Sequence, residues 1–213
     1  MIGGYIGLGI DEYGNFLNPG DNTDTGPGGT ANRIGLRGKG IISWPYLNAN
    51  FNSFYPNGTS LDNQHLAVQN TCKSGYVMSG ANWSTKTSTK LDNYAMLKDS
   101  SGNGAYVNLP SSQPIASGSA RTRGAATPIT YSLKITSAGK LSLNYSYNNG
   151  VYQPVMSNQD ITAANGKLPS KLLFGFTAST GGSTNTHEIT CFKASPTTIS
   201  SDSAALSLPT GQF

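Results

Sequence analysis

Charged side chains are scarce in this sequence, and those present do not gather. Of 213 residues only 11% are charged, with 14 Lys and Arg against 10 Asp and Glu. Nucleic-acid binding needs several basic groups close enough to neutralise neighbouring phosphates. Basic residues such as Lys39, Lys73, Lys134 and Lys193 instead stand singly along the chain. We therefore expect no nucleic-acid binding.

Cysteine and histidine are equally few, with two residues of each. Cys72 and Cys191 lie far apart, and neither stands in a Cys-x-x-Cys pair or near a histidine at the spacing of zinc ligands. We expect no zinc site. In an extracellular protein the two cysteines could form a disulfide with one another or with cysteines outside this chain. The alternative is two buried free thiols.

The chain also lacks an apolar run of about 18 residues, the length that a membrane-spanning helix needs. We therefore expect no membrane insertion. The first residues, MIGGYIGLGI, have neither the basic start nor the small-residue cleavage site of a signal peptide. Because the chain opens directly in a strand-like run, we expect a fragment of a longer secreted protein that works outside the cell.

Glycine, tyrosine and proline are plentiful, at 26, 11 and 11 residues. Short segments with alternating apolar residues recur between Gly, Asn and Pro, which predicts strands. These segments span residues 4–11, 33–38, 94–99, 129–136, 140–147, 151–156, 171–179 and 187–194. Within them, residues 130–155 predict a three-stranded antiparallel meander with turns at SAGK and NNG. The sequence therefore predicts an all-β fold, an antiparallel β-sandwich.

The middle of the chain, residues 43–125, is less regular and predicts a long insert that decorates the sandwich. Its one helix candidate is SLDNQHLAVQN, in which Ser60 can cap the N-terminus. We interpret Trp44 and Trp83 as packing anchors. From Ser195 the composition is that of a linker, so we expect a folded domain over residues 1–194 and a tail over 195–213.

Two segments resemble the legume-type (concanavalin-like) lectins. GLGIDEYGNF, residues 7–16, followed by NRIGLRG, is similar to that family's Asp-x-Tyr-x-Asn metal-loop strand and the strand after the loop. LLFGFTASTGGSTNTHEITCF, residues 172–192, is similar to its C-terminal Gly-Phe-x-Ala-x-Thr-Gly and His-Glu-Ile signature. The resemblance implies a concanavalin-like jelly roll with further strands and two binding loops upstream of Met1.

A narrower resemblance includes WPYLNANFNSFYP and AVQNTCKSG between these segments. With them the chain looks like the lectin-like region of bacterial type IV pilus tip-associated (PilY/PilC-type) adhesins. This resemblance implies a domain on the bacterial surface that binds a glycan or attaches to a host or abiotic surface. It also implies contacts with pilus components.

By position, the resemblance implies calcium ligands at Asp11, the Tyr13 carbonyl and Asn15, with Asp21 or Asp24 as the remaining carboxylate. The family's second, transition-metal site needs Glu where this chain has Gly9 and His where it has Arg33. We therefore expect no transition metal, and Ca²⁺ is the ion that the resemblance implies. The alternative is that Asp11 and Asn15 only hydrogen-bond the loop backbone, as in Asx turns.

The same resemblance places a carbohydrate site at Asn15, which would contact both ion and sugar, and at the loop TGGSTNT, residues 180–186. There Gly182 lets the backbone approach a ligand, while Ser183 and Asn185 can hydrogen-bond hydroxyl groups. Tyr13 or Phe16 would stack on the sugar ring. An exposed hairpin turn has the same composition, so that alternative stays open.

The sequence offers no clear catalytic pair. Asp11 and Glu12 are adjacent, so alternation along a strand points them to opposite faces, whereas glycosidases need two carboxylates facing one bond. His65 and His187 stand near no nucleophile motif. We therefore predict a noncatalytic carbohydrate-binding domain. The alternatives are a protein-interaction module on the same scaffold and, third, a glycoside hydrolase.

Overall fold

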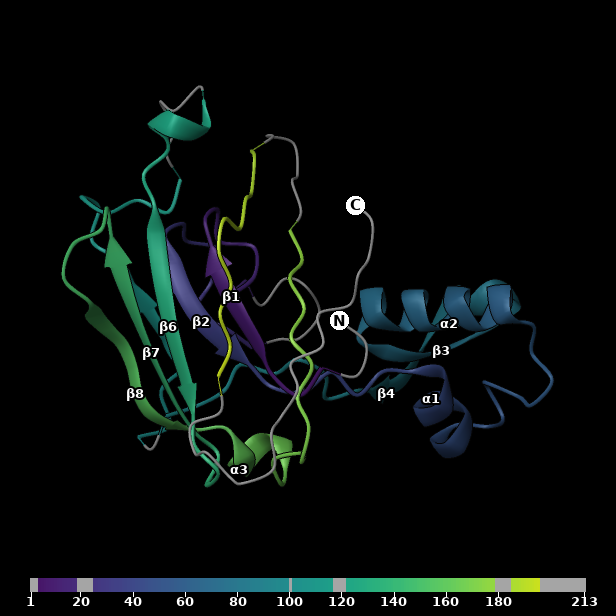
Figure 1. Cartoon of the computed structure of the whole chain (residues 1–213). Helices are drawn as coiled ribbons and strands as arrows, with labels where there is room; N and C mark the ends of the chain where they lie inside the picture. The colour runs from purple at the N-terminus through teal and green to yellow at the C-terminus, as the bar shows by residue number, and fades with distance from the viewer. Residues whose placement is uncertain (1–3, 19–24, 100, 117–121, 179–184, 196–213) are drawn as a thin grey trace. The chain divides into compact units, whose positions relative to one another are not determined.

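The strands of the computed structural model form three small antiparallel sheets (Figure 1). The structure describes residues 4–18, 25–99, 101–116, 122–178 and 185–195, and the chain divides into two compact units, residues 1–168 and 169–213. The predicted β-rich class is confirmed. The described residues do not show a single jelly roll, because the strands are distributed over two three-stranded sheets and one hairpin.

The first sheet contains β1 (Gly7–Asp11), β2 (Arg33–Arg37) and β5 (Tyr106–Asn108), with β2 in the centre. In β1 and β2, Gly7 pairs with Arg37 at one end of the sheet and Asp11 with Arg33 at the other. Alternation gives the two faces of β2 different roles. One face carries the fully buried Ile34 and Leu36, and the other carries both arginines.

The second sheet is the predicted meander, and the structure confirms it: β6 (Ile129–Ile135), β7 (Lys140–Tyr147) and β8 (Gln153–Asp160) pair in chain order. Positive φ angles at Gly139, Asn148 and Asn149 make its tight turns. The alternate β7 residues Leu141, Leu143 and Tyr145 belong to the same hydrophobic core as the apolar face of β2. Helix α3 (Thr162–Asn165) follows β8.

The insert between β2 and β5 builds a second hydrophobic core. It contains α1 (Trp44–Asn50), α2 (Leu61–Ser74) and the hairpin β3 (Tyr76–Ser79) and β4 (Thr85–Lys90), with short 3-10 turns at Ala81–Trp83 and, outside the insert, Arg123–Ala125. Helix α2 confirms the predicted helix, although the Ser60 side chain makes no capping bond. The sequence predicted a single helix in the insert, whereas the structure has two.

Packing in the insert is centred on aromatic rings, which confirms the anchor role predicted for Trp44 and Trp83. Their ring centroids lie 6.4 Å apart in an edge-on arrangement, and both rings contact Tyr55. The buried Tyr55 hydroxyl lies 2.8 Å from Thr71 Oγ1 and accepts a 2.7 Å hydrogen bond from the Met78 backbone N–H. These contacts join α2 and β3.

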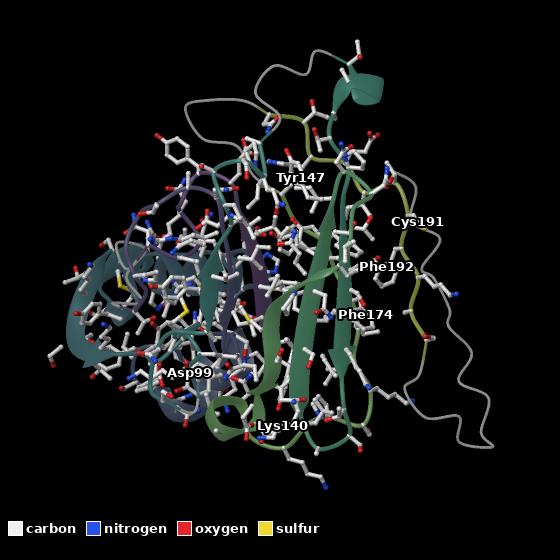
Figure 2. All side chains as sticks on the ribbon, turned by 90° about the vertical axis from the view of Figure 1, so that its left-hand side faces the viewer. Asp99, Lys140, Tyr147, Phe174, Cys191 and Phe192 are labelled. Carbon is white, nitrogen blue, oxygen red and sulfur yellow. The ribbon has the colours of Figure 1, made fainter. Side chains whose placement is uncertain are left out.

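In the second unit the structure differs from the prediction, since the described residues 171–178 and 185–195 are extended but form no strand ladder. Phe174 and Phe176 instead pack their rings on Phe192, with centroids 5.6 and 5.1 Å apart (Figure 2). Alternating apolar residues predict a strand only where a neighbouring strand supplies hydrogen bonds. Both cysteines are free, and Cys191 is exposed. None of the described helices is long and apolar enough to cross a membrane.

Asp160, at the end of β8, makes folding stability depend on pH. The Lys140 ammonium at 2.8 Å, and then the N–H and hydroxyl groups at the start of α3, hold the pKa of Asp160 well below its usual range. A carboxyl with a depressed folded-state pKa stabilises the fold above its unfolded pKa of about 4 and loses that effect as the pH falls.

We therefore expect the urea midpoint of the wild type to be higher than that of the Asp160→Asn variant. Above about pH 5 this difference should be constant. The difference should shrink steadily as the pH falls below about 4. Urea unfolding followed by circular dichroism across this range measures it. A difference that does not change with pH would contradict the assigned role.

Candidate functional site

The loop that leaves β1 folds back over the polar face of the first sheet, where two glycines make room for it. Gly9 and Gly35 pair directly across β1 and β2. The Phe16 ring occupies the space that a Cβ at Gly9 would need, and a Cβ at Gly35 would lie 2.6 Å from Leu17 Cδ2. The loop is thus seated on the strands through Phe16 and Leu17.

Asp11 fixes the tip of this loop from within. Its carboxylate is 5% exposed, and its two oxygens accept hydrogen bonds from the backbone N–H groups of Gly14 at 2.8 Å and Leu17 at 3.0 Å. Gly14 has a φ of 107°, in the region that favours glycine. The arrangement agrees with the alternative in which Asp11 organises the loop backbone as an Asx-type turn.

Arg37 holds the loop through its carbonyl groups, including that of the same Phe16–Leu17 peptide whose N–H binds Asp11. Its side chain is buried, and its guanidinium donates to the Phe16 carbonyl at 2.7 Å, the Thr25 carbonyl at 3.0 Å and the Asn18 carbonyl at 3.3 Å. Sequence reasoning missed this residue. The signal in the sequence was an arginine at the end of the apolar strand RIGLR. Burial of that strand also buries the guanidinium, which then needs hydrogen-bond acceptors around it.

Of the predicted site residues, the structure brings Asp11, Tyr13, Asn15 and Phe16 together on this one loop. The Tyr13 side chain is 75% exposed, and Asn15 is exposed as well. Phe16 is half-buried, and its ring lies near the Arg37 guanidinium as well as over the sheet, which gives it a packing role. Its predicted contact with sugar stays a prediction.

The other predicted site residues are Asp21, Asp24, Gly182, Ser183 and Asn185. Asp21, Asp24, Gly182 and Ser183 fall outside the described residues. Asn185 belongs to the second unit, is exposed, and its side-chain oxygen accepts a 2.8 Å hydrogen bond from the Thr186 N–H.

The two positions that correspond to the family's transition-metal ligands are occupied by strand residues that contact the rest of the fold. Arg33, at the position where the resembled family has a metal-binding His, donates to Asn108 Oδ1 at 2.7 Å and to the Gly28 carbonyl at 2.8 Å. Gly9, at the position of the family's Glu, lies under the Phe16 ring. In the part of the chain that the structure describes, no three acidic, His or Cys side chains gather as metal ligands would. Calcium at Asp11 stays a prediction.

Comparison of the chain with protein-family models, with curated proteins and with solved structures finds no match. The chemistry of the loop is therefore inferred from its own geometry. A rigid turn presents an exposed ring and an exposed amide, and these groups suit the apolar face and the hydroxyls of a sugar.

The seating of Phe16 on Gly9 can be tested by a double-mutant cycle. We expect Gly9→Ala to lower the free energy of unfolding by about 1–3 kcal/mol, because the added methyl group overpacks the contact. In a Phe16→Ala background the same change should cost much less. Gly124→Ala, where a Cβ would meet nothing within 4 Å, is the control and should be nearly neutral. Equal costs in both backgrounds would disprove the contact.

Removing the Asp11 carboxylate separates its two possible roles. We expect Asp11→Ala to destabilise the chain by about 1–3 kcal/mol, because two backbone N–H groups lose their acceptor. If the carboxylate serves the backbone, the loss is the same with added calcium and with chelator. Thermal unfolding under both conditions measures it. A calcium-dependent rise of the wild-type midpoint that is absent from the variant would instead assign Asp11 to an ion.

Proposed function

We propose that this chain is a noncatalytic carbohydrate-binding module of a bacterial surface or pilus-associated adhesin. Its two core-sharing sheets would be part of a concanavalin-like β-sandwich. One observation supports this most: Asp11 fixes a turn that holds Tyr13 75% exposed next to the exposed Asn15. A turn whose backbone is already fixed loses less conformational entropy on binding than a flexible loop would.

In this proposal Tyr13 stacks on the apolar face of a sugar ring, and the Asn15 amide hydrogen-bonds its hydroxyls. The Phe16–Leu17 peptide of the loop is held from two sides, because Asp11 accepts the Leu17 N–H and Arg37 donates to the Phe16 carbonyl. The resemblance to lectin and adhesin segments agrees with this assignment. A glycan on a host cell or on an abiotic surface coating is the expected ligand.

The alternative is a protein-interaction module, and the insert is the observation that favours it. The insert has its own hydrophobic core and presents Leu61 on α2 at 70% exposure and Phe54 at 39%. A pilus component would be the expected partner on this surface.

A hydrolase receives less support from the same geometry. Asp11 is buried and engaged with two backbone N–H groups, so it does not face a substrate as a nucleophile or an acid would.

Binding to a glycan array tests the proposal and separates it from the interaction module. We expect Tyr13→Ala and Asn15→Ala each to weaken glycan binding about tenfold, since a stacked ring or a good hydrogen bond contributes roughly 1 kcal/mol or more. The matched control is Leu61→Ala, an exposed apolar side chain in the insert, which should bind normally. Sugar-independent adhesion that is lost in Leu61→Ala and kept in Tyr13→Ala would favour the interaction module.

A further inference from the structure

A small hollow lined by both polar and apolar residues lies in the first unit, at the opposite end of β1 and β2 from the Asp11 loop. It has a volume of about 50 Å³. Its lining comes from three distant parts of the chain: Gly38 and Lys39 after β2, Asp92 and Ala95 at the end of the insert, and Ala164 and Asn165 in α3. Figure 1 shows α3 at the end of the second sheet where β6 finishes and β7 begins.

The hollow contains a buried donor that lacks a partner. Asn165 is 5% exposed, and its side-chain oxygen accepts a 2.9 Å hydrogen bond from the Lys39 backbone N–H. Its Nδ2 group is buried and makes no hydrogen bond to any described residue. Most buried amide groups are satisfied, and one that is not calls for an explanation such as a bound water or ligand.

The hollow also contains an acceptor that lacks a partner. Asp92 is exposed, and its carboxylate makes no hydrogen bond to the described residues. The Lys39 ammonium lies at the same site, 3.5 Å from the Asn165 backbone carbonyl. A group that bridges these side chains must accept from the amide and ammonium and donate to the carboxylate. A hydroxyl does both, whereas a simple anion or cation does only one.

The walls of the hollow are fixed before any ligand arrives. Asn93 Oδ1 accepts the N–H of Ile41 at 2.7 Å, and Gly38 N–H donates to the Ala95 carbonyl at 2.8 Å. Tyr94 has a φ of 54°, which is strained for a bulky residue. A Cβ at Gly38 would lie 2.8 Å from Asn165 Oδ1, so glycine is needed there for the asparagine to fit.

We propose that this hollow is a second sugar subsite, which takes the hydroxyl edge of a monosaccharide between Asn165, Lys39 and Asp92. The proposal rests on the proposed glycan-binding function and adds a contact that is separate from the Tyr13 loop. The volume admits one or two small polar groups and not a whole ring, so the rest of the sugar stays outside. A water molecule held there in the free protein is replaced by a hydroxyl that makes the same hydrogen bonds.

The test is a titration of the full chain with the methyl glycosides of glucose, mannose, galactose and N-acetylglucosamine, followed by ¹H–¹⁵N NMR. The side-chain NH₂ signals of Asn165 and Asn15 report on the two sites separately and are assigned from Asn165→Asp and Asn15→Asp variants. Glycine betaine, an osmolyte without hydroxyl groups, is the solvent control. A few hydrogen bonds predict a Kd on the order of 1 mM, so the titration extends about tenfold above that.

We expect one of the glycosides to shift the Asn165 NH₂ signals saturably. The exposed, conservative change Asp92→Asn should weaken this response about tenfold or more, as loss of a charged hydrogen-bond acceptor does. Tyr13→Ala should leave it unchanged. If the Asn165→Asp variant fails to fold, the wild-type titration and Asp92→Asn still decide the outcome.

The other results overturn the hollow site in distinguishable ways. Shifts at Asn15 alone would refute the hollow and keep the proposed function at the Tyr13 loop. No saturable shift at either signal, in a folded chain, would mean that the hollow holds water only and that neither sugar contact exists. Equal shifts with glycine betaine would show a solvent effect and would also refute the site.

Discussion

The buried guanidinium of Arg37 is the constraint on which the rest of the first unit depends. A buried charge is costly unless hydrogen bonds surround it. Arg37 meets this requirement by donating to the Phe16 carbonyl at 2.7 Å, the Tyr94 carbonyl at 2.9 Å and the Thr25 hydroxyl at 3.1 Å. The loop after β1 and the chain returning from the insert therefore both lie against the end of β2, and the returning chain pairs beside it at Arg37 and Met96. Removing the guanidinium would leave several buried carbonyls without donors.

The paired glycines Gly9 and Gly35 allow the loop that Arg37 binds to lie close to the strands. A charged side chain can hold carbonyls at one end of the sheet only if the loop can lie close to the strands, and Gly9 and Gly35 permit that approach. Asp11 then satisfies backbone N–H groups at the other end. The Asp11 carboxylate and the Arg37 guanidinium thus hold the loop on either side of the contact between Phe16 and Gly9. This is why the loop can be ordered while Tyr13 at its tip remains in solvent.

The sequence predicted those strands whose alternation is clean and whose turns are marked. The meander β6 to β8 was found because NNG and SAGK interrupt regular apolar spacing. β4 was missed because TKTSTK has no apolar residue, and β5 because it has only three residues. The segments 171–178 and 187–194 show the opposite failure, in which alternation is present without a strand ladder in the described residues.

The candidate sites divide in the same way. Asp11, Tyr13 and Asn15 were accessible to sequence reasoning because they are contiguous and because an acidic residue that follows a strand marks a loop. The hollow was not accessible, since Lys39 and Asn165 are 126 positions apart and neither belongs to a motif. Only the fold brings Asn165 and Asp92 to the lining of one hollow. A site whose residues come from segments far apart in the sequence leaves no motif by which sequence analysis could find it.

The two ends of the first sheet are physically linked, which bears on how a binding module of this kind would work. Arg37 donates to the Phe16 carbonyl in the Asp11 loop and to the Tyr94 carbonyl beside the hollow. One side chain therefore contacts the backbone next to each of the two candidate sites. The exposed groups are Tyr13 and Asn15 at one end and Asp92 and Lys39 at the other, whereas the side-chain amide of Asn165 is buried. A glycosidase would need two carboxylates directed at one bond, whereas the Asp11 carboxylate accepts hydrogen bonds from the Gly14 and Leu17 backbone N–H groups.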